Sequence, residues 1–206
     1  MGRHARSIRW KNLVWRSIRT VTYAALAGAI RCAPLEGEPM AFTLTSRAFT
    51  HQGTMPTSCT CDGADSSPPL AWTDPPTGTK SFALITDDPD APVGAWVHWI
   101  LYNVPAERRS LTERLPTTET LADGARQGLN AFRRIGYGGP CPPPGPAHRY
   151  VFTLYALDTL LTLPPKATTA QLERAMAGHT LARTELIGRF QRDLSLRDTM
   201  NGRTTR

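Results

Sequence analysis

Two histidines and two aspartates are the residues of this chain best suited to chemistry in a binding site. His98 lies in the strand-like stretch Trp96–Val104, and His148 ends a loop rich in proline and glycine. Asp88 and Asp90 lie in the turn that precedes the strand-like stretch. An imidazole can donate a hydrogen bond to an anion without a permanent buried charge, and a carboxylate can orient an imidazole or accept from a ligand amine. These residue types favour a small pocket for a phosphate-sized anion.

The same residues could also serve a metal site or a hydrolase. The histidines and aspartates could ligate a metal, but no helical His-Glu-x-x-His motif accompanies them, so we expect no metal and no other cofactor. A hydrolase could use Asp88 with His98, but no Ser or Cys lies in a recognisable nucleophile motif. Cys141 is the only candidate nucleophile near the histidines. We therefore expect a non-catalytic binding protein without catalytic residues.

Two proline-bearing turns and three apolar strands are expected to hold these side chains. Residues 136–146 contain five prolines and four glycines, and proline lacks the N–H that a helix or a central strand needs. We predict a stiff loop there, followed by a strand over Tyr150–Leu157 that is buried on both faces. Ser81–Thr86 is predicted to be another strand, which ends at the turn Asp87–Pro92. Trp96–Val104 is predicted to be the third.

The geometry within these elements leads to three further predictions. The period of two in a strand puts His98 on the same apolar face as Ile100. The Ala91–Pro92 peptide is expected to be cis, since cis peptides belong largely to proline and to tight turns. Gly138 and Gly139 are expected to bring backbone N–H groups close to the ligand.

In their order along the chain, these motifs resemble the phosphatidylethanolamine-binding protein family, and in particular its bacterial Raf kinase inhibitor-like branch. The resemblance extends from about Phe42 to Gln191. The matching segments are Cys61–Gly63, Ser67–Leu70, Asp87–Pro92, Trp96–Trp99, Gly136–Pro143 and His148–Tyr150. The sequence departs from the family pattern at Cys59, Ser66, Ala131 and Arg133.

The resemblance implies a β-sandwich with an anion pocket. The pocket positions that it implies are Asp88, Asp90, Trp96, His98, Pro140, His148 and Tyr150. Gly139 is added as a candidate ligand-binding residue because of its backbone N–H. The expected ligand is a small phosphate-type anion or a phosphoethanolamine head group. Inhibition of a kinase or protease through surface loops, a role reported in relatives, is the main alternative and would require a protein partner.

The remaining pattern predicts a mainly β fold with helices at its C-terminal end. Short strands separated by turn residues favour two packed antiparallel sheets. Thr168 begins a capping box for a helix that reaches Met176, and Gly178 suits the end of that helix. A second helix is predicted from His179 to Gln191, where apolar residues recur every four positions.

The basic charge of the chain is concentrated before this predicted domain. The 206 residues carry a formal net charge of +7, and residues 1–39 hold seven of the 24 Lys and Arg residues but only two of the 17 Asp and Glu residues. We predict a basic extension over 1–39, a domain over 40–192 and a polar tail over 193–206. A domain near neutrality lacks the clustered basic face that nucleic-acid binding needs, so no nucleic acid is expected.

Three interpretations of residues 1–39 stay open: a disordered or wrongly assigned extension, a targeting segment, and an amphipathic helix at an anionic membrane surface. We expect a cytoplasmic protein, with export or organelle targeting through residues 1–39 as the alternative. A homodimer is a further candidate assembly.

The four cysteines do not form a zinc-binding pattern, because only Cys59 and Cys61 are close in sequence. The favoured interpretation is free thiols in a reducing compartment. The alternative is a long-range disulfide between Cys141 and either Cys59 or Cys61.

Overall fold

The computed structural model describes residues 41–192, so the predictions for residues 1–39 and 193–206, and for Cys32, lie outside the described part. The strands are β1 (Thr43–Thr45), β2 (Leu70–Thr73), β3 (Ser81–Asp88), β4 (Trp96–Pro105), β5 (Ser110–Leu111), β6 (Arg126–Gln127), β7 (His148–Leu157) and β8 (Thr180–Phe190). The helices over the same residues are a 3-10 turn, η1 (Thr57–Cys59), and the α-helix α1 (Thr169–Met176).

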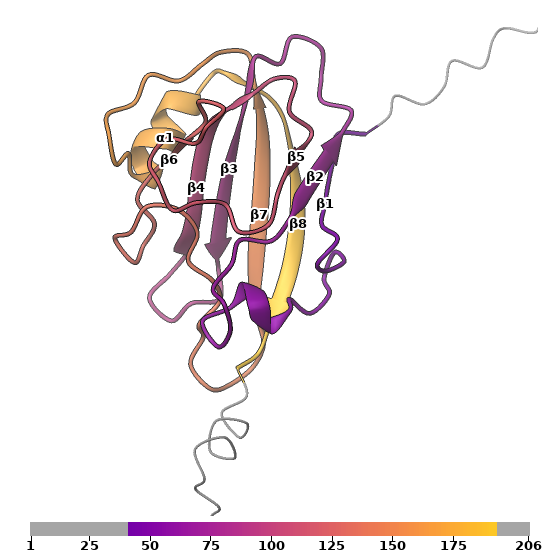
Figure 1. The fold of residues 1–206 in the computed structure, drawn as a ribbon, viewed down its shortest axis with the longest axis vertical. Helices are drawn as coiled ribbons and strands as arrows, with labels where there is room; N and C mark the ends of the chain where they lie inside the picture. Colours follow the sequence, from indigo (N-terminus) through magenta and orange to yellow (C-terminus); the bar gives the residue numbers. More distant parts are fainter. Residues whose placement is uncertain (1–40, 193–206) are drawn as a thin grey trace, which may run out of the picture. The chain divides into compact units, whose positions relative to one another are not determined.

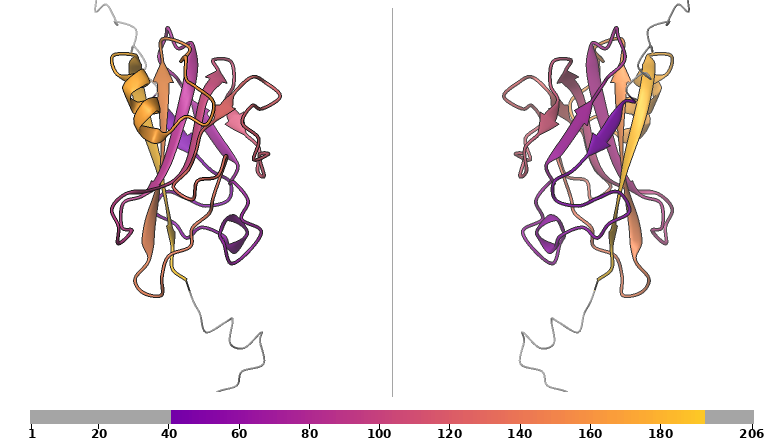
Figure 2. Two further views of the ribbon diagram at one scale, coloured as in Figure 1. Left: turned by 90° about the vertical axis from the view of Figure 1, so that its left-hand side faces the viewer. Right: turned by 90° about the vertical axis from the view of Figure 1, so that its right-hand side faces the viewer.

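The strands form two antiparallel sheets, as predicted (Figure 1). The smaller sheet has the order β1-β2-β5, and the larger has the order β6-β4-β3-β7-β8. The smaller sheet packs on one face of the larger one through the main hydrophobic core. Helix α1 packs on the opposite face through a second core cluster (Figure 2). The central strands are therefore covered on both faces.

The side chains of β3 show how the sequence specifies this arrangement. Phe82 and Leu84 belong to the core between the sheets, whereas Ala83 and Ile85 face the cluster that contains α1. All four are buried, which explains why this strand is apolar without alternation. The predicted strands over β3, β4 and β7 are confirmed.

Helix α1 is confirmed together with its capping box. The Thr168 hydroxyl accepts from the Gln171 N–H, and the Gln171 side chain accepts from the Thr168 N–H at 2.8 Å. Gly178 follows the helix with a φ of +79°, a conformation that favours glycine. Neither helix within residues 41–192 is long and apolar enough to cross a membrane.

The predicted second helix over His179–Gln191 is wrong, because Thr180–Phe190 forms strand β8, paired with β7. The apolar residues Ala182, Leu186 and Phe190 recur every four positions, and this spacing also fits one face of a strand. Gly188 packs against Met55, where an added Cβ would lie 2.5 Å from Met55 Cγ. The pairing with β7 and the close contact between Gly188 and Met55 therefore favour a strand over a helix in this segment.

A β-bulge in β4 corrects the predicted face of His98. Thr86 pairs with Trp99 and Asp87 pairs with Val97, so His98 is an extra residue without a partner on β3. Its ring contacts Tyr150, which belongs to the core between the sheets, whereas Ile100 belongs to the cluster around α1. Bulges redirect side chains in this way and are frequent beside functional sites.

The expected cis peptide at Ala91–Pro92 is also wrong, since residues 41–192 contain no cis peptide. The turn closes instead through a hydrogen bond of 3.1 Å from the Gly94 N–H to the Ala91 carbonyl, with Gly94 at a φ of +93°. A trans proline at the second position of such a turn needs no special geometry.

Candidate functional site

A pocket of about 200 Å³ opens at the end of the larger sheet, where β3 ends and where β4 and β7 begin. Its polar and aromatic walls are formed by Asp88, Trp96, His98, Phe132 and His148. Its remaining lining residues are Ala91, Pro92, Val93, Cys141, Pro142 and Pro143. Four of the eight predicted site residues thus meet in one cavity, from three different strands.

His148 and Asp88 form a buried pair at this pocket. The distance from His148 Nδ1 to Asp88 Oδ2 is 2.7 Å, and the two residues are only 8% and 4% exposed. Because a carboxylate oxygen accepts, Nδ1 of His148 carries the proton and Nε2 is the ring nitrogen left for a ligand. The second oxygen of Asp88 accepts from the Asp90 N–H at 2.9 Å. This pair fixes the imidazole in one orientation.

His98 is held in place by a backbone carbonyl and by two aromatic rings. Its Nδ1 lies 2.6 Å from the Gly138 carbonyl oxygen, and its ring meets the rings of Tyr150 and Phe132 edge to face. Burial lowers the pKa of His98 below its ordinary value of 6.5, although hydrogen bonding to Gly138 and the charge of Asp88 oppose this effect. His98 is therefore a neutral imidazole at pH 7.

Asp90, which was predicted to bind the ligand, does not line the pocket. Its carboxylate accepts from Nε and Nη2 of Arg149 at 2.9 Å and 2.7 Å, and from the Arg149 backbone N–H. Hydrogen bonding from Arg149 lowers the pKa of Asp90 to about 2. This ion pair ties the turn after β3 to the start of β7.

Gly139 and Pro140 do not provide the predicted contacts either. The Gly138 N–H donates to the His98 carbonyl at 3.0 Å, and the Gly139 N–H donates to Asp65 Oδ1 at 2.6 Å, so neither is left for a ligand. The Pro140 carbonyl accepts from the Cys61 N–H. The loop instead forms the pocket wall with its next three residues, Cys141, Pro142 and Pro143.

Tyr150 supports the site from beneath and is not a wall of the pocket. It is buried, and its ring centroid lies 5.2 Å from that of His98. Burial and the charge of Asp88 raise the pKa of the Tyr150 phenol. Its contact with the ligand remains a prediction.

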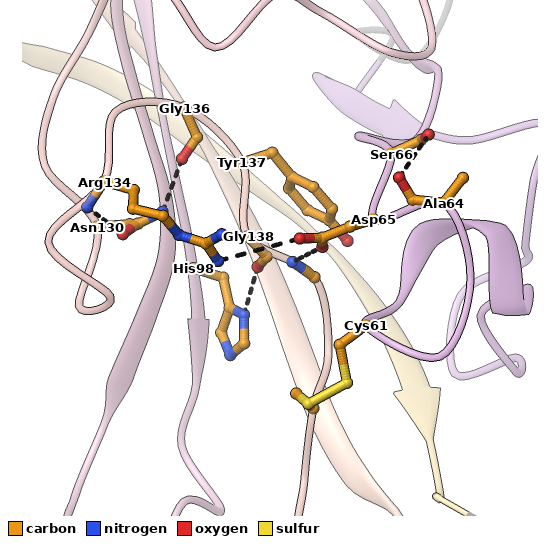
Figure 3. A network of polar contacts seen from close by, with 12 residues as sticks. Cys61, Ala64, Asp65, Ser66, His98, Asn130, Arg134, Gly136, Tyr137 and Gly138 are labelled. Carbon is orange, nitrogen blue, oxygen red and sulfur yellow. Dashed lines mark hydrogen bonds and ion pairs between the residues drawn. A yellow bond between two sulfur atoms is a disulfide. The ribbon is translucent and has the colours of Figure 1, made fainter. Parts of the chain in front are cut away.

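Sequence reasoning missed Phe132, which lies in a loop closed by Asn130. The Asn130 side chain donates to the Gly136 carbonyl at 3.0 Å and accepts from the Arg134 N–H at 3.0 Å (Figure 3). These bonds hold the loop that presents Phe132 to Trp96 and His98.

A disulfide links Cys61 to Cys141, with a Cα–Cα distance of 5.4 Å. The favoured interpretation of free thiols is therefore wrong for these two residues, and one of the two alternative bridges is present. The Tyr137 hydroxyl donates to the Cys59 carbonyl at 2.8 Å and supports the same connection. Cys59 stays a buried thiol, and burial raises its pKa. Cys141 is thus not available as a nucleophile in the disulfide-bonded protein.

Within the described residues, acidic, histidine and cysteine side chains do not gather into a metal-binding group. No cluster of three or more such residues with suitable geometry occurs in the part of the chain between residues 41 and 192.

Comparison with known proteins agrees with this fold. The family model for phosphatidylethanolamine-binding proteins matches residues 45–191. A UPF0098 protein of Methanothermobacter thermautotrophicus is 48% identical over 149 residues, which cover 72% of this chain and 98% of that protein. A UPF0098 protein of Aquifex aeolicus is 47% identical over 150 residues, which cover 72% of this chain and 87% of that protein.

Two solved structures are also similar. CT736 of Chlamydia trachomatis, described as a phosphatidylethanolamine-binding protein homolog, has a TM-score of 0.68 and 41% identity, and the match covers 74% of this chain and 99% of CT736. YbcL of Escherichia coli, described as a member of the mammalian PEBP family, has a TM-score of 0.67 and 33% identity, with the same coverage of both chains.

Proposed function

The chain belongs to the phosphatidylethanolamine-binding protein family, and from this premise we propose that its pocket binds a small phosphate-bearing ligand without converting it. The ligand is free phosphate or the monoester phosphoethanolamine. Binding is weak and serves recognition or regulation.

One observation carries the proposal: the buried Asp88–His148 pair keeps Nε2 of His148 as the ring nitrogen available to the pocket. When His148 is protonated, Asp88 balances its charge, and Nε2–H becomes a charge-assisted donor to a phosphoryl oxygen. A volume of about 200 Å³ accommodates a phosphate group with a short substituent and is small for a drug-sized ligand.

The rim of the pocket suits the rest of such a ligand. Pro92, Val93 and Pro143 are exposed, and the Val93 residue is 78% exposed. A head group that binds at the histidines can therefore rest its methylene groups on apolar side chains. This combination of a polar base and an apolar rim supports an ester of phosphate more strongly than a wholly polar ligand.

The composition of the walls supports binding without turnover. The lining residues include no serine, no threonine and no free thiol, since Cys141 is oxidised. Covalent catalysis by a side-chain nucleophile would require one of these groups. Hydrolysis by a water activated at the Asp88–His148 pair is the second candidate function, because an oriented imidazole can serve as a general base.

Calorimetric titration of the full chain with phosphoethanolamine tests the proposal. We expect millimolar or tighter binding, weakened about ten- to a hundredfold by His148→Ala or His98→Ala, since one charge-assisted hydrogen bond contributes about 1.5–3 kcal/mol. His179→Ala is a matched control, because His179 also pairs with an aspartate, Asp158, at 2.8 Å but in an exposed position.

Phosphate release is followed in the same samples. If titration with millimolar phosphoethanolamine gives no heat of binding, the anion site is refuted. Release of inorganic phosphate by the wild type but not by His148→Ala would favour the hydrolase.

A further inference from the structure

One of the two pocket histidines, His98, is held so that it presents a hydrogen-bond acceptor to a ligand. We propose that His98 acts as an acceptor, so that the site selects oxyanions that carry an acidic O–H, such as hydrogen phosphate and phosphomonoesters, over sulfate and phosphodiesters. This inference rests on the proposed function, because it names the ligand class of the same pocket.

The acceptor role follows from the anchoring of His98. The Gly138 carbonyl oxygen can only accept, so the 2.6 Å contact requires a proton on Nδ1 of His98. A neutral imidazole carries one proton, and its other nitrogen, Nε2, then presents a lone pair. His98 is 3% exposed, and burial holds its pKa below the ordinary value. At pH 7 the group that His98 offers to a ligand is therefore an acceptor.

Asp65 strengthens this arrangement through a single peptide unit. The Gly138 carbonyl and the Gly139 N–H belong to the same peptide, and the Gly139 N–H donates to Asp65 Oδ1 at 2.6 Å (Figure 3). Hydrogen bonds in such a chain polarise one another, so the carboxylate makes the carbonyl a better acceptor. Asp65 is therefore a positioning residue that holds the proton on Nδ1 of His98.

The geometry around Gly138 leaves little freedom for the imidazole. The Gly138 N–H donates to the His98 backbone carbonyl at 3.0 Å, while the Gly138 carbonyl accepts from the His98 ring. Two bonds thus join the same pair of residues. Rotation of the ring to expose Nδ1 would break one of them and would also disturb the edge-to-face contact with Tyr150.

His148 is held in a fixed orientation beside His98. Its Nδ1 proton is held by Asp88, and its Nε2 is the site of the second proton. Neutral His98 thus gives the pocket an acceptor whatever the charge of His148. A phosphomonoester can donate to this acceptor, because its second ionisation has a pKa near 6 and about a quarter of it keeps one P–OH at pH 6.5.

Sulfate and phosphodiesters lack that proton. If one of these ligands binds, a lone pair of its oxygen faces the lone pair on Nε2 of His98. The alternative is that the buried imidazole of His98 becomes protonated. The charged and titratable groups that face His98 are Asp88 from β3, His148 and Tyr150 from β7, and Asp65 from the loop after η1. The carboxylates favour protonation, and burial outweighs them.

Calorimetry of the full chain with four probes tests the selection: inorganic phosphate, phosphoethanolamine, sulfate and the diester glycerophosphoethanolamine. At pH 6.5, where phosphate and phosphoethanolamine still carry a P–OH in substantial fraction, we expect the first two to bind at least about tenfold more tightly than the last two, within the range for an unsatisfied buried polar group. The difference between phosphate and sulfate should shrink toward pH 5, because protonation turns His98 into a donor that sulfate can use.

Nitrogen-15 spectra of the histidine rings supply an independent readout. In the free wild type at pH 7.5, His98 should show the Nδ1–H tautomer. Asp65→Asn should lower the pKa of His98 measured by titration, because a negative charge is removed. Asp62→Asn, a change in the same loop at a carboxylate that pairs with Arg192, should leave that pKa unchanged.

The outcomes separate the two proposals. Absence of binding by all four probes would refute both the anion pocket and its selectivity. Equal affinity for phosphate and sulfate at pH 6.5, or an Nε2–H tautomer of His98, would overturn the selectivity and leave the anion pocket standing.

Discussion

The Cys61–Cys141 disulfide should contribute a large share of the stability of the domain. We consider the double variant Cys61→Ser with Cys141→Ser. The disulfide joins residues 80 positions apart, and loop-closure entropy for a loop of that length corresponds to about 4.5 kcal/mol in the unfolded state. Since removal of native disulfides typically costs about 2–5 kcal/mol, we expect a loss in that range.

The folded state should keep its local geometry in this variant. The Cys61 N–H still donates to the Pro140 carbonyl, and the Tyr137 hydroxyl still donates to the Cys59 carbonyl. Most of the loss therefore arises from the greater freedom of the unfolded chain. With an m-value of about 2 kcal/mol per molar urea, the unfolding midpoint should fall by roughly 1–2.5 M.

Urea unfolding followed by tryptophan fluorescence, with and without a reducing agent, measures this change. The wild type should be destabilised by the reductant, whereas the double variant should be insensitive to it. Cys59→Ala is the matched control, because Cys59 is a buried thiol outside the disulfide and the variant should keep its sensitivity to the reductant. A change below about 1 kcal/mol in the double variant would refute the disulfide's contribution to stability.

Three further substitutions test single contacts. Asp90→Asn should remove a pH dependence of stability. Because Arg149 lowers the pKa of Asp90, the ionised carboxylate stabilises the fold above pH 4, and this contribution is lost as the pH falls from about 4 to about 2. Acid unfolding of the wild type and the variant would measure this difference. Gly139→Ala should lower the melting temperature without a direct loss of ligand contact, because an added Cβ would lie 2.3 Å from the Cys59 carbonyl oxygen; an unchanged melting temperature would contradict this packing argument. Thr168→Ala should cost about 1 kcal/mol in urea unfolding through loss of the helix cap, and a neutral effect would show that the cap contributes nothing.

Local patterns in the sequence predicted those parts of the molecule that depend on local chemistry. The apolar run of β3, the capping box at Thr168 and the meeting of His98 with His148 were all visible as residue types at fixed spacing. The pocket residues come together because β3 pairs with both β4 and β7. The apolar composition of these three strands, which turns bound, indicated that they lie at the centre of the fold.

Features that depend on long-range contacts were not predictable in the same way. The face of His98 depends on a bulge, and an extra residue in a strand leaves no mark on the period of two. The spacing in β8 fits a helix and a strand equally, and pairing with β7 decides between them. The hydrogen bond from Gly139 to Asp65 joins loops 74 positions apart, so the sequence alone suggested a ligand contact in its place.

A crystal structure of the chain with phosphoethanolamine tests the central claim most directly. The account predicts the phosphoryl group in the pocket, with oxygens within about 3.2 Å of Nε2 of both His98 and His148, and with Nδ1 of each still bonded to Gly138 and Asp88. Density for the ligand at another site, or an empty pocket at saturating ligand, would contradict it.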